Sequence, residues 1–118
     1  MFDKITEINL LYDFYSQLLT EKQQEVIRLY HGENFSLSEI GDEFSISRQG
    51  VYDSLKNAEK ALFDYEAKLG LLKKFTHTSN IVEDATGKID EMLGVCKESD
   101  EIADKLNSLK EIISELNR

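Results

Sequence analysis

The residue types that most often carry catalytic or metal chemistry are few in this chain and lie far apart. There is one cysteine, Cys96, and there are two histidines, His31 and His77. Zinc sites and nucleophilic sites need several such groups in a fixed pattern, and no such pattern is present. The carboxylates within residues 98–101 gather at an expected helix start, where the helix dipole stabilises them without an ion. We therefore expect no enzyme, no metal and no cofactor.

A different chemistry is indicated by residues 37–55, which have the pattern of a helix-turn-helix motif. In such a motif the first turn of the second helix faces base edges, where arginine and glutamine are suitable readers and lysine contacts phosphate. The candidate residues for binding nucleic acid or another partner are Ser47, Arg48, Gln49, Tyr52, Asp53 and Lys56.

The charge balance opposes strong DNA binding by this motif. The whole chain carries 14 Lys+Arg and 23 Asp+Glu, a net charge of -9. Residues 36–60 contain three basic residues (Arg48, Lys56, Lys60) and five acidic ones (Glu39, Asp42, Glu43, Asp53, Glu59), a local balance of -2. Because neutralised phosphates supply most nonspecific affinity, we expect only weak binding to duplex DNA. Protein docking, contact with RNA or a ribonucleoprotein, and promoter binding all stay open.

The composition predicts that helices position these residues. The 118-residue chain has no proline, only six glycines and 41% apolar residues, which favours an all-α domain. Apolar spacing predicts a first helix over residues 3–19 and a second that starts after Thr20 and stops near Gly32. Two further helices are expected, one capped by Ser36 and one running from the cap Ser47 to residue 70.

The crossing of the two motif helices depends on a small residue, and Gly41 supplies it. The shared core is expected from Ile40, Phe44, Ile46, Val51 and Leu55. Ser45 stands where many such motifs place glycine in the left-handed turn.

Leu19-Thr20-Glu21-Lys22-Gln23, Leu37-Ser38-Glu39-Ile40 and Ser47-Arg48-Gln49-Gly50-Val51-Tyr52-Asp53 resemble the YlxM-type family, whose helix-turn-helix is similar to region four of sigma factors and has no wing. The resemblance covers residues 3 to about 75. It implies a small cytoplasmic bacterial protein with a non-enzymatic regulatory or accessory role in the signal-recognition-particle pathway. The implied partner is the particle's GTPase or its RNA. A DNA-binding transcriptional regulator is the alternative function.

Residues 76–80 lack periodicity and divide the chain into a domain at 1–75 and a helical segment at 76–118. That segment is expected to hold a helix around residues 80–97, with Cys96 on its apolar stripe, and a second helix capped by Ser99. The expected dimerisation seam is Ile102, Leu106, Leu109, Ile113 and Leu116. We expect a homodimer, and the alternative is a monomeric hairpin in which the seam folds back on Val82, Ile89 and Leu93.

The chain has no signal-peptide core near its start and no stretch of about 20 apolar residues. A single cysteine is typical of a reducing compartment. A cytoplasmic protein without membrane insertion is therefore expected.

Overall fold

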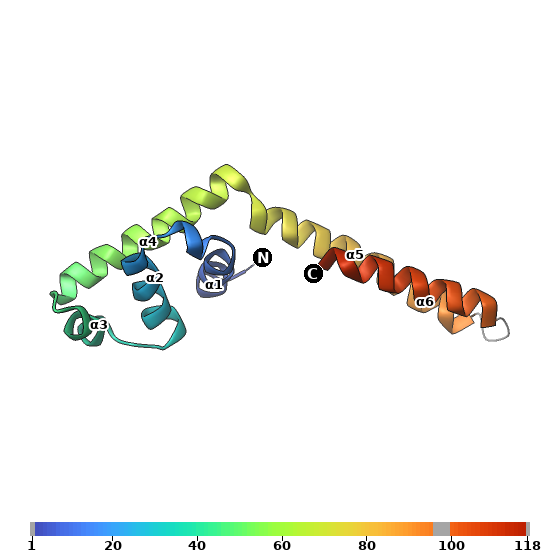
Figure 1. Ribbon diagram of the computed structural model, residues 1–118, viewed down its shortest axis with the longest axis horizontal. Coiled ribbons are helices and arrows are strands. Elements are labelled where there is room, and N and C mark those ends of the chain that lie inside the picture. The colour runs from blue at the N-terminus through green and yellow to red at the C-terminus, as the bar shows by residue number, and fades with distance from the viewer. Residues whose placement is uncertain (1, 96–99, 118) are drawn as a thin grey trace. The chain divides into compact units, whose positions relative to one another are not determined.

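The computed structural model describes residues 2–95 and 100–117, and within them every regular element is helical (Figure 1). The elements are α1 (Lys4–Tyr15), η1 (Ser16–Leu18), α2 (Glu21–Ile27), η2 (Arg28–Gly32), α3 (Leu37–Phe44), α4 (Arg48–Leu69), α5 (Leu71–Val95), α6 (Asp100–Ser114) and η3 (Glu115–Asn117). They form two compact units, Met1–Leu72 and Lys73–Arg118. The prediction of an all-α fold is confirmed.

The first unit begins with α1, which is shorter than the expected helix over residues 3–19. Asp3 caps it by accepting the backbone N–H of Thr6 at 2.7 Å. The α-helix ends at Tyr15, and a tighter 3-10 turn, η1, follows. Such a turn at a helix end satisfies carbonyls that the α-helix leaves without partners.

Two capping boxes start the next helices, as predicted. The Thr20 hydroxyl accepts the N–H of Gln23 at 3.1 Å, and the Gln23 side chain accepts the N–H of Thr20 at 3.0 Å. Ser36 and Glu39 repeat the arrangement at 3.1 and 2.9 Å. Each box satisfies two backbone N–H donors that have no partner within the helix. The capping residues thereby set the first residues of α2 and α3. α2 then widens into a π-helical turn, η2, that ends at Gly32.

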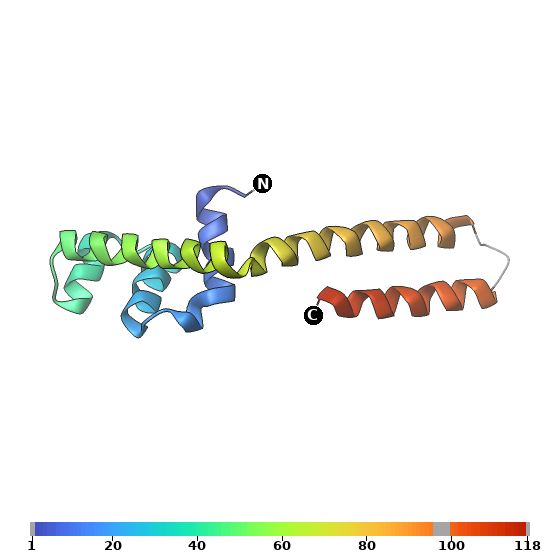
Figure 2. The same cartoon turned by 90° about the horizontal axis from the view of Figure 1, so that it is seen from above.

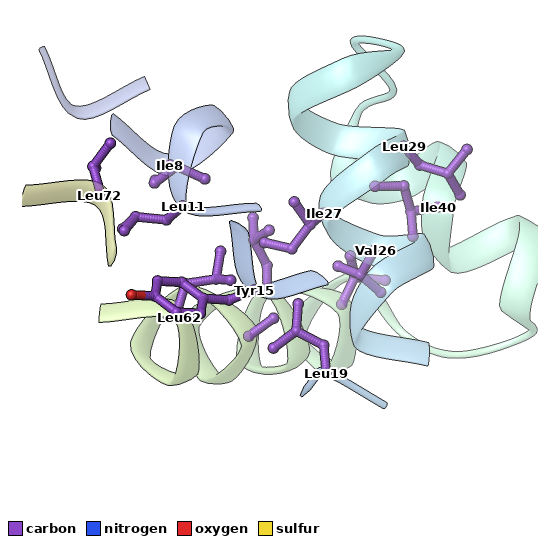
Figure 3. Packing of buried hydrophobic residues seen from close by; sticks show 13 residues of the cluster. Ile8, Leu11, Tyr15, Leu19, Val26, Ile27, Leu29, Ile40, Leu62 and Leu72 are labelled. Carbon is purple, nitrogen blue, oxygen red and sulfur yellow. The ribbon is translucent and has the colours of Figure 1, made fainter. Parts of the chain in front are cut away.

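The long helix α4 is the element against which the others pack. It runs for 22 residues and ends where Gly70 adopts a left-handed conformation at φ 63°. Helices α1, α2 and α3 all contact it, and their apolar residues meet along its length (Figure 3). The buried cluster is Ile8, Leu11, Tyr15, Leu19, Val26, Ile27, Leu29, Ile40, Val51, Leu55, Ala58, Leu62 and Leu72.

A polar network fixes the corner between α4 and the start of α5. The Tyr15 hydroxyl donates to Oε1 of Glu66 at 2.7 Å and accepts the N–H of Leu71 at 3.0 Å. The same Glu66 oxygen accepts the N–H of Leu72 at 3.0 Å. Burial, followed by the hydrogen bond to Glu66, raises the pKa of Tyr15. Two N–H groups at the start of α5 are thereby satisfied by side chains.

Residues 76–80 are helical, contrary to the expected loop, because α5 runs from Leu71 to Val95; the two compact units divide between Leu72 and Lys73. Ser79 occupies a position that shares a helix face with Val82, three residues later. The Ser79 hydroxyl lies 3.3 Å from Oδ1 of Asn117. A polar contact is therefore made from a helix position at which helical periodicity would predict an apolar side chain. The helix therefore continues without the apolar signal that would have revealed it.

In the second unit α6 lies antiparallel to α5 (Figure 2). Lys110 Nζ and Asp90 Oδ1 are 2.8 Å apart across the pair, and Val82 and Ile89 are buried. The expected seam is divided: Leu106 and Ile113 are half-buried, whereas Ile102, Leu109 and Leu116 are exposed. The predictions for Cys96 and for the cap Ser99 lie outside the described residues.

Candidate functional site

The helix-turn-helix depends on a close backbone approach at Gly41. A Cβ atom at this position would lie 2.7 Å from the carbonyl oxygen of Ile46, closer than side-chain carbons approach backbone. The same turn is held by the N–H of Ile46, which donates to the Gly41 carbonyl at 2.9 Å. Ser45 adopts the left-handed backbone conformation at φ 57° and ψ 43°. As the sequence predicted, a serine occupies the strained turn position at which many such motifs have glycine.

This turn presents the N-terminal end of α4 to solvent. The Ser47 hydroxyl accepts the N–H of Gly50 at 3.0 Å and thus acts as the helix cap. Arg48 is the first residue of the helix and is exposed. A cation there faces the positive end of the helix dipole, which is unfavourable for stability. Folding alone therefore gives no stabilising role to a cation at this position.

The next turn of α4 continues the exposed face. Gln49 donates its amide N–H to Oδ1 of Asp53 at 3.1 Å, so these two side chains hold each other. Tyr52 is 43% exposed, and the ammonium of Lys56 lies 5.5 Å from the centre of its ring. All six candidate binding residues are exposed. Arg48, Tyr52 and Lys56 are the larger groups on this face, whereas Ser47 and Asp53 are engaged in local hydrogen bonds.

A buried contact between a histidine and a glutamate beneath this face was missed by sequence reasoning. Nε2 of His31 and Oε2 of Glu59 are 2.7 Å apart, and both side chains are more than nine-tenths buried. Lys56 Nζ also lies 3.4 Å from Oε1 of Glu59. Local spacing could not have revealed this contact, because 28 residues separate the histidine from the glutamate. The contact joins the π-helical turn η2 to α4.

A hollow of about 560 Å³ opens beside Tyr52 and Lys56. Lys4 from the start of α1 and Asn34 from the loop before α3 also line it. The sequence gave no signal that Lys4 belongs near the helix-turn-helix, because tertiary packing alone brings α1 to this place. The hollow combines lysines with an exposed aromatic ring, a surface able to contact an anionic or flat group.

The structure also changes how the acidic balance of the motif is read. Glu39 is committed to the cap with Ser36, and these hydrogen bonds lower its pKa. Glu59 is buried with His31. Glu39 therefore stays ionised and its charge still counts toward the balance of -2 over residues 36–60, whereas Glu59 is partnered by His31 and Lys56.

Within residues 2–95 and 100–117 no three His, Cys, Asp or Glu side chains are grouped to hold a metal ion. In that same part of the chain no helix is both long and apolar enough to cross a lipid bilayer.

Comparison with known proteins places this motif in a family. The family model described as "UPF0122: Putative helix-turn-helix protein, YlxM / p13 like" matches residues 2–117. The similarity therefore extends through the second unit, beyond the expected limit near residue 75.

Individual relatives are also similar to this chain over most of its length. UPF0122 protein YlxM of Bacillus subtilis is 41% identical over 110 residues, covering 93% of this chain and 96% of its own. UPF0122 protein BH2485 of Halalkalibacterium halodurans is 48% identical over 90 residues, 76% and 83% of the two chains. UPF0122 protein lwe1821 of Listeria welshimeri is 38% identical over 112 residues, 95% and 99% of the two chains. The helix-turn-helix geometry and these similarities lead to one conclusion: the chain belongs to the YlxM / p13-like helix-turn-helix family.

Proposed function

We propose that this protein is a non-enzymatic regulatory or accessory factor that binds a protein or ribonucleoprotein partner through the exposed face of α4. The observation that carries the proposal is Arg48 in the first turn of α4, where it works against the helix dipole and faces solvent. With Tyr52 and Lys56 it forms a surface of two cations and an aromatic ring. Arginine and tyrosine are the residue types that most often dominate binding energy at interfaces.

The proposed partner is the signal-recognition-particle GTPase or the particle's RNA, as the YlxM-type resemblance implies. The net charge of -9 favours the protein component, because a basic RNA-binding protein attracts an acidic partner whereas RNA repels it at long range. The cationic face of α4 then supplies a local contact rather than the long-range attraction.

A DNA-binding transcriptional regulator is the second candidate. One observation favours it: Arg48 and Gln49 stand in the first turn of α4, the place from which helix-turn-helix proteins contact base edges. The amide of Gln49 is held by Asp53, which would have to release it for a bidentate contact with adenine.

Isothermal titration against the purified GTPase, the purified RNA and a duplex DNA separates these candidates. We expect binding to the GTPase, and Arg48→Ala and Tyr52→Ala should each weaken it by about 1–3 kcal/mol, or about 5- to 150-fold. Lys60→Ala is the matched control, because Lys60 is also an exposed cation on α4 but pairs with Asp64 at 2.8 Å.

The melting temperature of each variant should stay near that of the parent protein, because the replaced side chains are exposed. No heat with either the GTPase or the RNA at tens of micromolar would refute the assignment to this pathway. Sequence-selective, nanomolar DNA binding at about 150 mM salt would favour the regulator instead.

A further inference from the structure

The hairpin of α5 and α6 carries polar contacts on one side of its seam. Val82 and Ile89 are the buried residues of α5 within the second unit and mark the side that faces α6. Helical residues advance by about 100° each, so Ser79 and Asp90 lie to one side of that direction. Their contacts with Asn117 and Lys110 show that the corresponding sides of α6 and η3 lie there too.

The opposite side of the same hairpin carries mostly apolar side chains, with Lys88 and Lys105 among them. On α5, Ile81 and Met92 lie about 70–90° from the buried direction, away from Asp90. On α6, Leu109 and Ile112 lie away from Lys110 by the same rule. The polar sides of α5 and α6 lie on the same side of the hairpin. The apolar sides of the two helices therefore lie together on the other side and form one surface. We call it the apolar flank, and its main members are Ile81, Met92, Leu109, Ile112 and Leu116, which are 43–66% exposed.

The apolar flank has the size of the largest patches on monomeric proteins, which are often functional. Five side chains, each about half exposed, present several hundred Å² of apolar surface, within the range of roughly 300–600 Å² for such patches. One partner's share of a standard interface is about 800 Å². The flank can therefore supply the apolar centre of such an interface, with the surrounding residues making up the rest.

The charges that border the flank indicate what covers it. Lys88 pairs with Glu91 on α5 at 3.9 Å, and Lys105 pairs with Glu101 on α6 at 3.5 Å. Each of these lysines is paired with a glutamate of its own helix, so the two pairs carry no net charge and offer little attraction to nucleic acid or to an anionic membrane. A second copy of the same surface meets no net repulsion there, and each copy supplies both signs to the other.

We propose that the apolar flank is the surface through which two copies of this chain associate. A twofold axis brings the two flanks face to face and turns two hairpins into a bundle of four helices. This interface differs from the expected seam. Leu106 and Ile113 stay within each hairpin, whereas Ile81 and Met92 of α5 join Leu109 in the contact between copies.

Light scattering on the full chain tests the proposal, over concentrations from about 1 to about 100 µM. We expect a mass near twice 13.6 kDa at the upper end, falling to one chain in both Leu109→Asp and Ile112→Asp. Leu18→Asp is the matched control, because Leu18 is an equally exposed leucine, at 52%, in the first unit. It should leave the mass doubled.

Far-ultraviolet circular dichroism of each variant shows whether the helices persist. If Leu109→Asp loses helix, Ile112→Asp decides, because Ile112 is the most exposed of the five, at 66%, and matters least to the hairpin itself. A mass of one chain at every concentration would overturn the proposal. So would a dimer that persists in a fully helical Ile112→Asp variant, because another surface would then hold the copies together.

Discussion

Replacing Gly41 with alanine tests the packing on which the helix-turn-helix depends. In an ordinary helix this change stabilises by about 0.5–1 kcal/mol, because glycine loses more backbone freedom on folding. Here the added Cβ would lie 2.7 Å from the carbonyl oxygen of Ile46, and that oxygen belongs to backbone that cannot rotate away. Overpacking of this kind costs about 1–3 kcal/mol. We expect a net destabilisation of about 1–2 kcal/mol, and a larger loss for Gly41→Leu.

The assay can follow the first unit by itself. All five tyrosines lie between residues 12 and 65 and there is no tryptophan, so tyrosine fluorescence reports on that unit alone. For a domain of this size, a loss of about 1–2 kcal/mol lowers the melting temperature by about 4–16 °C. Gly32→Ala is the matched control within the same unit, because its Cβ would meet no atom within 4 Å. Its melting temperature should not fall.

An opposite result in α5 would strengthen the reasoning. Gly87 is also helical and has open space around its Cβ position, so Gly87→Ala should raise the stability of its helix, as measured by circular dichroism. If Gly41→Ala melts at or above the temperature of the parent protein, the close crossing of α3 and α4 is refuted.

Two further predictions concern polar groups of the first unit. Tyr15→Phe should lower the free energy of unfolding in urea by about 1–3 kcal/mol, because the Leu71 N–H and the Glu66 carboxylate each lose a short hydrogen bond. Tyr12→Phe is the control, since the Tyr12 hydroxyl lies 3.5 Å from its acceptor. Equal losses in the two variants would contradict the network. Hydrogen bonds from Ser36 lower the pKa of Glu39 from its usual 4.5, so its contribution to stability is complete above that value and is lost as the pH falls through the lower folded value. Glu39→Gln keeps the capping geometry without a titrating group, so it should flatten the acid side of a plot of melting temperature against pH. Glu43→Gln, on the same helix but outside the cap, should flatten that side less. Equal effects of the two variants would contradict the role assigned to Glu39.

The local features of this fold were predictable from the sequence. Thr20, Ser36 and Ser47 cap helices because each hydroxyl can accept an N–H only two or three residues away, an interaction that needs no distant partner. Gly41 was recognised for a similar reason, because a motif of fixed spacing requires a small residue there. The exposure of Arg48 and Tyr52 follows from the same periodicity.

The sequence prediction failed where a polar side chain occupies a helix position at which the periodic pattern predicts an apolar one. The helix through residues 76–80 was missed because Ser79 meets Asn117, 38 residues away, and no local pattern records such a contact. The end of α1 at Tyr15 was missed because the apolar pattern runs on into the 3-10 turn Ser16–Leu18 and carries no mark of where the α-helix stops.

What the sequence by itself determined is the all-helical class, the caps of α2, α3 and α4 and the face of α4 that meets solvent, because periodicity and capping act over three or four residues. What only the tertiary structure decided is which side chains meet across helices. The pairing of His31 with Glu59, the approach of Lys4 to the motif and the division of the apolar residues of α6 between hairpin and apolar flank all depend on packing between segments distant along the chain. A helix's own sequence defines its apolar face, but the direction in which that face is buried is set by the neighbour that covers it.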